Sequence, residues 1–171
     1  MKKNQRIILM LGSLFIAATF VIIFGTQKEI LPVGSPLPGI KFTSPNDSGF
    51  VHSSKRPLMV VFFRPDCPHC QYELEVLNKR IDQLKNSDIY FITTDKNFLK
   101  DSLLNSQTNL INSQNVTFGC VSGSSYKQQF GIAATPAFFF FDEQGKLTGK
   151  IIGETKFEKI RSELNNKLTI N

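Results

Sequence analysis

Two cysteines separated by two residues, in the segment Cys67-Pro68-His69-Cys70, are the residues of this 171-residue sequence best suited to chemistry. Thiols at this spacing can close a small disulfide ring and open it again. At a helix start, unpaired N–H groups and the helix dipole stabilise a thiolate on the first cysteine. We therefore predict that Cys67 is the nucleophile that attacks a disulfide, and that Cys70 resolves the mixed disulfide.

Ionisable neighbours are expected to tune this pair. A cationic imidazole on His69 would favour the Cys67 thiolate, and each unit of pKa depression is worth about 1.4 kcal/mol. Arg64 would act in the same direction if it points at the site, whereas Asp66 would oppose it. Asp66 is also a plausible N-cap of the helix, with Pro68 in the first turn. A stabilised reduced state makes the disulfide more oxidising.

The elements that must hold the cysteines follow from the hydrophobic pattern. The run from Leu58 to Phe63 is continuously apolar, which is typical of a strand covered on both faces. After the motif, apolar residues recur every three or four positions and give a helix one apolar stripe, at Leu74, Leu77, Ile81 and Leu84. Further strands are expected at 88–93, 116–121, 137–141 and 146–152, and further helices at 95–105, 124–130 and 157–168. This order predicts an α/β fold, a central mixed sheet flanked by helices.

Other uses of the cysteines fit less well. Zinc needs a second pair of ligands, and only Cys120, His52 and His69 remain, without suitable spacing. A peroxidase of the peroxiredoxin type has the pattern P-x-x-x-T-x-x-C, but Val60 and Arg64 occupy those positions here. We predict no metal and no cofactor beyond the cysteine pair itself, and we interpret Cys120 as a small buried hydrophobic residue.

The N-terminal segment predicts the compartment. Residues 7–24 carry no charge, and a helix of this length would span about 27 Å, close to the roughly 30 Å of a bilayer core. Basic residues at positions 2, 3 and 6 place residues 1–6 in the cytoplasm. We expect a single-pass anchor in a bacterial cytoplasmic membrane, with the catalytic domain in the periplasm or an equivalent extracytoplasmic space. A cleaved signal peptide is the alternative, although no clear A-x-A site follows.

The remaining chain is expected to divide into a proline-rich tether and domain entry, residues 25–45, which becomes the first, irregular part of the domain, and the main body of that domain, residues 46–171. Its charges do not indicate a nucleic-acid partner. The formal net charge is +6, from 20 basic and 14 acidic residues, but three of the basic residues, at positions 2, 3 and 6, lie before the apolar segment. The other lysines and arginines are scattered among acidic residues, without a basic stripe interleaved with aromatics.

A strand, a C-x-x-C motif at a helix start and a late Thr135-Pro136 before a buried strand together resemble the thioredoxin fold. Within it, the sequence from Val33 to Leu168 is similar to the membrane-anchored TlpA/ResA-like thiol-disulfide oxidoreductases. Residues 33–38 resemble the first motif of that family, residues 67–70 its redox motif and residues 132–138 its cis-proline loop. The CPHC tetrapeptide itself is like that of DsbA, a strong oxidant.

This resemblance implies roles for further residues. Pro136 would be cis and packed against the disulfide, leaving the backbone of Thr135 free to pair with an extended substrate segment. Glu73, one helical turn after Cys70, stands where the resembling reductases carry a glutamate that exchanges protons with the thiols. A solvent-facing helix charge is the alternative for Glu73.

The expected function is extracytoplasmic disulfide exchange with protein thiols and disulfides, with a redox partner in the membrane. The scaffold resembles reductases and cytochrome c maturation factors, whereas the CPHC motif resembles an oxidase or isomerase, so the direction of electron flow stays open. The alternative function is a non-catalytic thioredoxin-fold module that binds extended peptides or acts like a chaperone.

Overall fold

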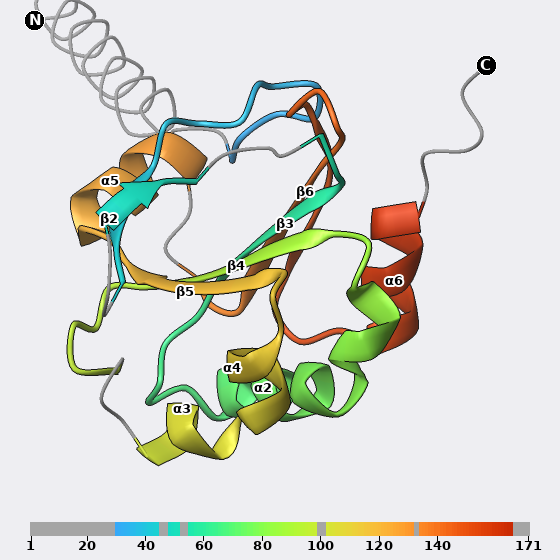
Figure 1. The fold of residues 1–171 in the computed structure, drawn as a ribbon. Helices are drawn as coiled ribbons and strands as arrows, with labels where there is room; N and C mark the ends of the chain where they lie inside the picture. Colours follow the sequence, from blue (N-terminus) through green and yellow to red (C-terminus); the bar gives the residue numbers. More distant parts are fainter. Residues whose placement is uncertain (1–29, 45–47, 52–54, 99–101, 132–133, 166–171) are drawn as a thin grey trace, which may run out of the picture.

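The computed structural model describes residues 30–44, 48–51, 55–98, 102–131 and 134–165 (Figure 1). The predicted anchor at 7–24 lies outside these residues. In the described segments, no helix is both long and apolar enough to cross a membrane.

One mixed sheet of seven strands forms the centre of the fold. Its strands are β1 (Lys41–Thr43), β2 (Ser48–Phe50), β3 (Leu58–Phe62), β4 (Asp88–Thr93), β5 (Val116–Cys120), β6 (Ala137–Phe141) and β7 (Leu147–Ile152). They lie in the order β2-β1-β5-β4-β3-β6-β7. The β3/β4 and β4/β5 pairs are parallel and the other pairs are antiparallel. The predicted mixed sheet is confirmed, and β3 lies inside it.

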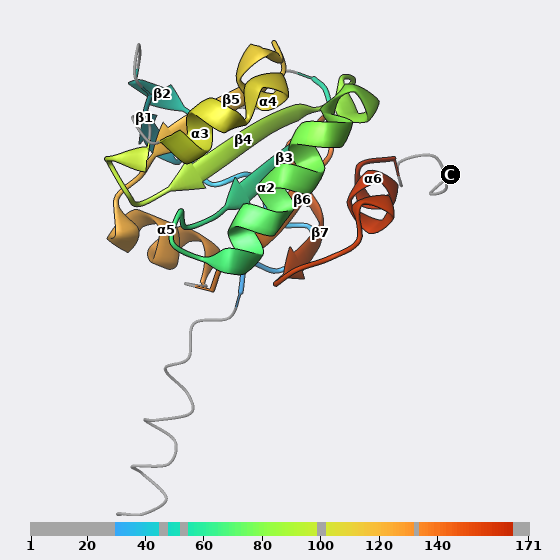
Figure 2. The same ribbon diagram turned by 90° about the horizontal axis from the view of Figure 1, so that it is seen from below.

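Helices cover both faces of the sheet, as Figure 2 shows from below. They are α2 (Pro68–Arg80), continued by a 3₁₀ turn at Ile81–Leu84, α3 (Ser102–Ser106), α4 (Thr108–Asn112), α5 (Gly123–Phe130) and α6 (Phe157–Asn165). Alternate residues of β3 enter two separate cores, as the period of a strand requires. Met59 and Val61 pack with α2, α4 and α6, whereas Val60 and Phe62 pack with α5.

The predicted helix at 95–105 is wrong at residues 95–97, and residues 99–101 lie outside the described residues. The segment after β4 turns instead, because its side chains bind the nearby backbone. The Thr93 hydroxyl accepts from the Asp95 N–H over 3.2 Å, and the Asp95 carboxylate accepts from the Asn97 N–H over 2.8 Å. Such local bonds compete with helix formation. Phe98 is still fully buried, as predicted.

Within the predicted tether and domain entry, residues 25–45, the described residues from Ile30 onward are bonded to the domain. The Leu31 N–H donates to Phe130 O over 3.0 Å, and the Gly34 N–H donates to Leu147 O over 2.7 Å. Further on, β1 pairs with β5 through Thr43 and Cys120. Residues from Ile30 onward therefore belong to the folded body rather than to a free tether.

Candidate active site

The backbone register of two neighbouring strands brings the two halves of the site together. Phe62, at the end of β3, pairs with Ala137, at the start of antiparallel β6. The loop that carries Cys67 and the loop that carries Pro136 therefore meet at one edge of the sheet.

The start of α2 differs from the prediction in one residue. Cys67 itself is the N-cap, in an extended conformation, and Pro68 occupies the first turn. Asp66 is not the cap, because its carboxylate binds Arg64: the Arg64 Nε donates to Asp66 Oδ1 over 3.0 Å, and a second bond joins Nη2 to Oδ2. This partner keeps the pKa of Asp66 below its usual value.

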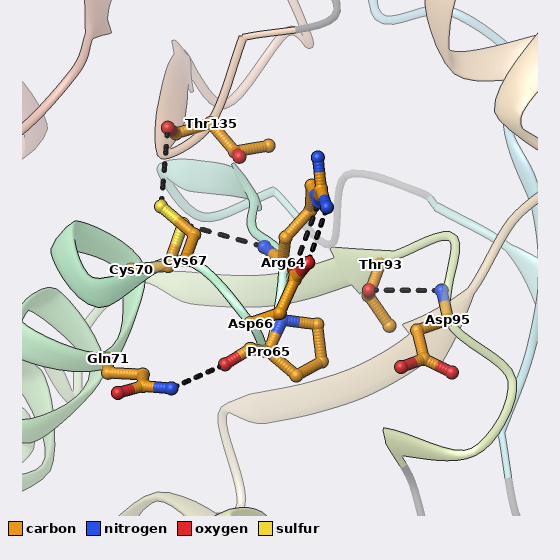
Figure 3. A network of polar contacts seen from close by, with 9 residues as sticks. All are labelled: Arg64, Pro65, Asp66, Cys67, Cys70, Gln71, Thr93, Asp95 and Thr135. Carbon is orange, nitrogen blue, oxygen red and sulfur yellow. Dashed lines mark hydrogen bonds and ion pairs between the residues drawn. The ribbon is translucent and has the colours of Figure 1, made fainter.

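The two active-site cysteines are free thiols in different environments (Figure 3). Cys67 is partly exposed, and its Sγ lies 3.8 Å from the carbonyl oxygen of Thr135. Cys70 is buried, with 1% of its surface exposed, and its Sγ accepts from the Arg64 backbone N–H over 3.5 Å. Only the first cysteine is therefore accessible to a substrate.

Their pKa values are shifted in opposite directions. Burial opposes ionisation of Cys67, but hydrogen bonds from the Cys70 thiol and from the backbone N–H groups of Cys70 and His69 outweigh it. The pKa of Cys67 therefore falls below its ordinary value. Burial raises the pKa of Cys70 to about 11. This division agrees with the predicted roles of nucleophile and resolving thiol, since the thiolate is the nucleophile.

The structure gives Arg64 and His69 other contacts than the predicted ones. The Arg64 guanidinium pairs with Asp66, and the Arg64 backbone N–H donates to the Cys70 Sγ. The His69 Nδ1 lies 2.6 Å from Glu154 Oε2, in the loop between β7 and α6. His69 donates a hydrogen bond to the Cys67 sulfur through its backbone N–H rather than through its imidazole.

Glu73 is buried, with 2% of its surface exposed, so the solvent-facing alternative is wrong. Its Oε1 accepts from the Thr155 N–H over 2.6 Å, and its buried Oε2 has no hydrogen-bond partner among the described residues. Burial raises the pKa of Glu73, and the nearby Glu154 adds to this effect. Buried carboxyls with raised pKa values are typical of groups that exchange protons.

The proline loop lies against the nucleophile. The Thr135–Pro136 peptide bond is cis, as the resemblance predicts. Pro136 is buried, and its carbonyl oxygen accepts from the Gly153 N–H over 2.8 Å. The loop is therefore joined to the segment that follows β7.

Tyr126 is a part of the site that sequence reasoning missed. Its hydroxyl donates to the carbonyl oxygen of Ala134 over 3.0 Å, and its ring stacks on Phe62 with centroids 3.7 Å apart. Burial, with a smaller contribution from Cys70, raises the pKa of Tyr126. An aromatic residue in a short helix gives no sequence signal for the loop it will support.

The third cysteine lies elsewhere in the sheet. Cys120 is buried at the end of β5, opposite Thr93 of β4, which agrees with its interpretation as a small packed residue. In the part of the chain that the structure describes, no group of three or more His, Cys, Asp or Glu side chains could hold a metal ion.

A strand that leads into a C-x-x-C motif at a helix start, with a cis-proline loop beside the first sulfur, defines the class of thioredoxin-fold dithiol proteins. The sequence profile of the thioredoxin-like domain matches residues 50–168, and the chain belongs to this family. The predicted family and the predicted oxidoreductase class are thereby confirmed at this level.

Solved structures share the fold. A peroxiredoxin-like protein from Aquifex aeolicus superposes with a TM-score of 0.67 at 16% identity, over 82% of this chain and 90% of that chain. The thioredoxin domain of a thiol-disulfide oxidoreductase from Bacteroides vulgatus superposes with a TM-score of 0.62 at 18% identity, over 80% of this chain and 97% of that chain. A putative thiol:disulfide interchange protein DsbE from Chlorobium tepidum superposes with a TM-score of 0.59 at 14% identity, over 80% of this chain and 97% of that chain. No curated protein is significantly similar in sequence.

Proposed function

We propose that this protein exchanges disulfides with other proteins on the extracytoplasmic side of a membrane, with Cys67 as nucleophile and Cys70 as resolving thiol. The observation that carries the proposal is the asymmetry of the pair. Cys67 is accessible and has a lowered pKa, whereas Cys70 is buried and has a pKa of about 11. A dithiol enzyme needs this difference, because one thiol must attack the substrate as a thiolate while the other stays protonated until the mixed disulfide has formed.

In the reducing direction, the Cys67 thiolate attacks one sulfur of a substrate disulfide. The substrate S–S bond breaks, a mixed disulfide forms, and the other substrate sulfur leaves and takes up a proton. Cys70 then loses its proton and attacks the Cys67 sulfur, which releases the second substrate thiol. The substrate gains two electrons and Cys67–Cys70 becomes a disulfide; the same steps in reverse oxidise a substrate.

The attack of Cys70 on the mixed disulfide requires a group that takes up the proton of the Cys70 thiol. At a pKa of about 11, only about one Cys70 thiol in ten thousand is ionised at neutral pH. Glu73, buried one turn further along α2 with a raised pKa, is the proposed group that takes up this proton. The proposed substrate contact is an extended segment that pairs with the backbone of Thr135, next to the nucleophile.

The cellular setting is part of the proposal. The uncharged segment 7–24, preceded by basic residues, supports a membrane anchor with the domain outside the cytoplasm. Electrons would then pass to or from a redox partner in the membrane. No metal or further cofactor is needed for the exchange.

Thiol counting tests the function on the full chain in mild detergent. After denaturation, which exposes the buried Cys70 and Cys120, the reduced protein should take up three alkyl groups and the oxidised protein one, on Cys120. A Cys70→Ser variant should form a mixed disulfide with a disulfide-containing protein, and Cys67→Ser should not. Cys120→Ser is the matched control and should lose the same two thiols on oxidation, going from two alkyl groups to none. An unchanged thiol count on oxidation would instead indicate the non-catalytic peptide-binding module.

The reduction potential decides the direction of electron flow. Equilibration with glutathione should give a value between that of DsbA, about −120 mV, and that of thioredoxin, about −270 mV. A value near the first assigns an oxidase or isomerase role, and a value near the second assigns a reductase.

A further inference from the structure

The loop between β7 and α6, residues 153–156, contacts the redox site at three points. Before Glu154, the Gly153 N–H donates to Pro136 O over 2.8 Å. After it, the Thr155 N–H donates to Glu73 Oε1 over 2.6 Å. Glu154 itself lies 2.6 Å from the His69 Nδ1. One short loop therefore joins the cis-proline loop, the buried carboxyl and the redox motif.

These bonds fix the backbone of Glu154 on both sides. Gly153 has a φ of 92°, a conformation that side-chain-bearing residues rarely adopt, so the turn into Glu154 depends on glycine. The carboxylate is thus presented to His69 by a preset backbone. Both partners are substantially exposed, with 69% of the His69 side chain and 45% of the Glu154 side chain accessible. Exposed pairs contribute little to stability, so a role in folding does not explain the contact.

We propose that Glu154 is a positioning residue of the redox site, which holds the His69 imidazole against the β7–α6 loop and so limits the oxidising power of the Cys67–Cys70 disulfide. An imidazole held by a carboxylate is not available to the Cys67 sulfur. Without the cationic imidazole, the Cys67 thiolate of the reduced state is less stabilised, which makes the disulfide less oxidising.

The inference rests on the proposed function, since it concerns the equilibrium of the same cysteine pair. That equilibrium is the reaction of the protein disulfide with two glutathione thiols, which gives the protein dithiol and one glutathione disulfide. In this reaction the protein gains the two electrons that the two glutathione molecules lose. Its equilibrium constant measures the oxidising power directly.

The experiment measures this constant for the full chain in mild detergent. Glu154→Ala should raise it about two- to fivefold, the range expected for losing an exposed ion pair. In a His69→Ala background, the same change should have no further effect. Glu158→Ala is the matched control, because Glu158 is an exposed carboxylate that lines the same surface pocket as Glu154 and pairs with Arg80 instead. It should leave the constant unchanged.

Three outcomes overturn the inference. Glu154→Ala could match wild type, or it could shift the constant equally with and without His69, which would assign the effect to charge alone. Either result leaves the proposed function intact, provided that wild type titrates reversibly. If wild type forms no reversible Cys67–Cys70 disulfide, the proposed function fails, and the inference fails with it.

Discussion

The backbone N–H of Thr155 donates a hydrogen bond to Oε1 of Glu73 over 2.6 Å, which joins the loop after β7 to the interior of α2. The other carboxyl oxygen has no partner among the described residues, and the side chain is removed from solvent. One hydrogen bond to one oxygen offsets only part of the cost of burying a charge. The ionised form of Glu73 is therefore disfavoured in the folded protein.

This environment predicts a pH-dependent stability. Burial raises the pKa of Glu73 above its ordinary value of 4.5. The contribution of Glu73 to the free energy of unfolding is thus complete below the ordinary value and is lost as pH rises through the raised pKa. Glu73→Gln removes this loss. In urea unfolding of the reduced proteins, the free energy of unfolding of the variant should increase relative to that of wild type as pH rises above about 4.5.

Glu75→Gln is the matched control for this prediction. Glu75 lies two residues further on the same helix, is exposed, and pairs with Lys79. The variant should differ from wild type by no more than about 0.5 kcal/mol, as expected for such a pair. If the unfolding free energies of Glu73→Gln and wild type run parallel across this pH range, Glu73 is not a desolvated acid.

The lowered pKa of Cys67 should depend on Cys70. Because the Cys70 thiol and backbone donate to the Cys67 sulfur, a Cys70→Ala variant loses one of these donors. The pKa of Cys67 should rise toward its ordinary value, and alkylation at neutral pH should slow about three- to tenfold. The pH profile of thiolate absorbance measures the shift. Cys120→Ala should leave the Cys67 rate unchanged, and an equally fast Cys70→Ala variant would contradict the assignment.

The central unit of the fold could be predicted because its signals are local. The apolar run of β3, the stripe of α2 and the CPHC motif between them lie within one stretch of sequence. Gly131 follows the predicted helix at 124–130 directly, and it ends α5 with a φ of 74°. Recognition of Thr135-Pro136 as the cis-proline loop came from family resemblance rather than from the residues alone.

The missed features depend on contacts between distant segments. His69 and Glu154 are 85 positions apart, and nothing in either local sequence indicates that they meet. Strand β1 has three residues, too few for a period-two pattern to stand out. Phe42 of β1 packs in the same core as Tyr126 and Phe130 of α5, a contact between distant segments that the local sequence does not indicate.

Strand β1 leads to a prediction about Gly119. A Cβ on this residue of β5 would lie 2.6 Å from Cδ2 and 3.0 Å from Cβ of Phe42. Since Phe42 is buried and its ring packs edge-on against Tyr90, it has little room to move. Gly119→Ala should reduce the free energy of unfolding by about 1–3 kcal/mol. Chemical denaturation measures the loss.

Gly149 provides the comparison. A Cβ there would lie 2.5 Å from Oε2 of Glu163, the far end of a flexible side chain. The carboxylate can swing away, so Gly149→Ala should cost less than about 1 kcal/mol. Equal losses in the two variants would show that Phe42 is not held tightly in the sheet.

The hydroxyl of Tyr126 should contribute to stability through the proline loop. Tyr126→Phe keeps the ring stacked on Phe62 but removes the donor to Ala134 O. The expected loss in unfolding free energy is about 1 kcal/mol. Tyr72→Phe, on an exposed side chain, should change it by less than about 0.5 kcal/mol. A Tyr126→Phe variant as stable as wild type would mean that this bond contributes nothing.

The early start of the folded body limits how far the enzyme can reach. Leu31 and Gly34 are bound to the domain through their backbones, and Lys150 Nζ donates to the carbonyl oxygens of Ile30 and Leu31. With the proposed anchor ending at residue 24, only residues 25–29 separate membrane from body, a span of at most about 18 Å. The domain would stay within roughly one bilayer thickness of the lipid surface, so its partners would meet it by lateral diffusion or by coming to the membrane themselves.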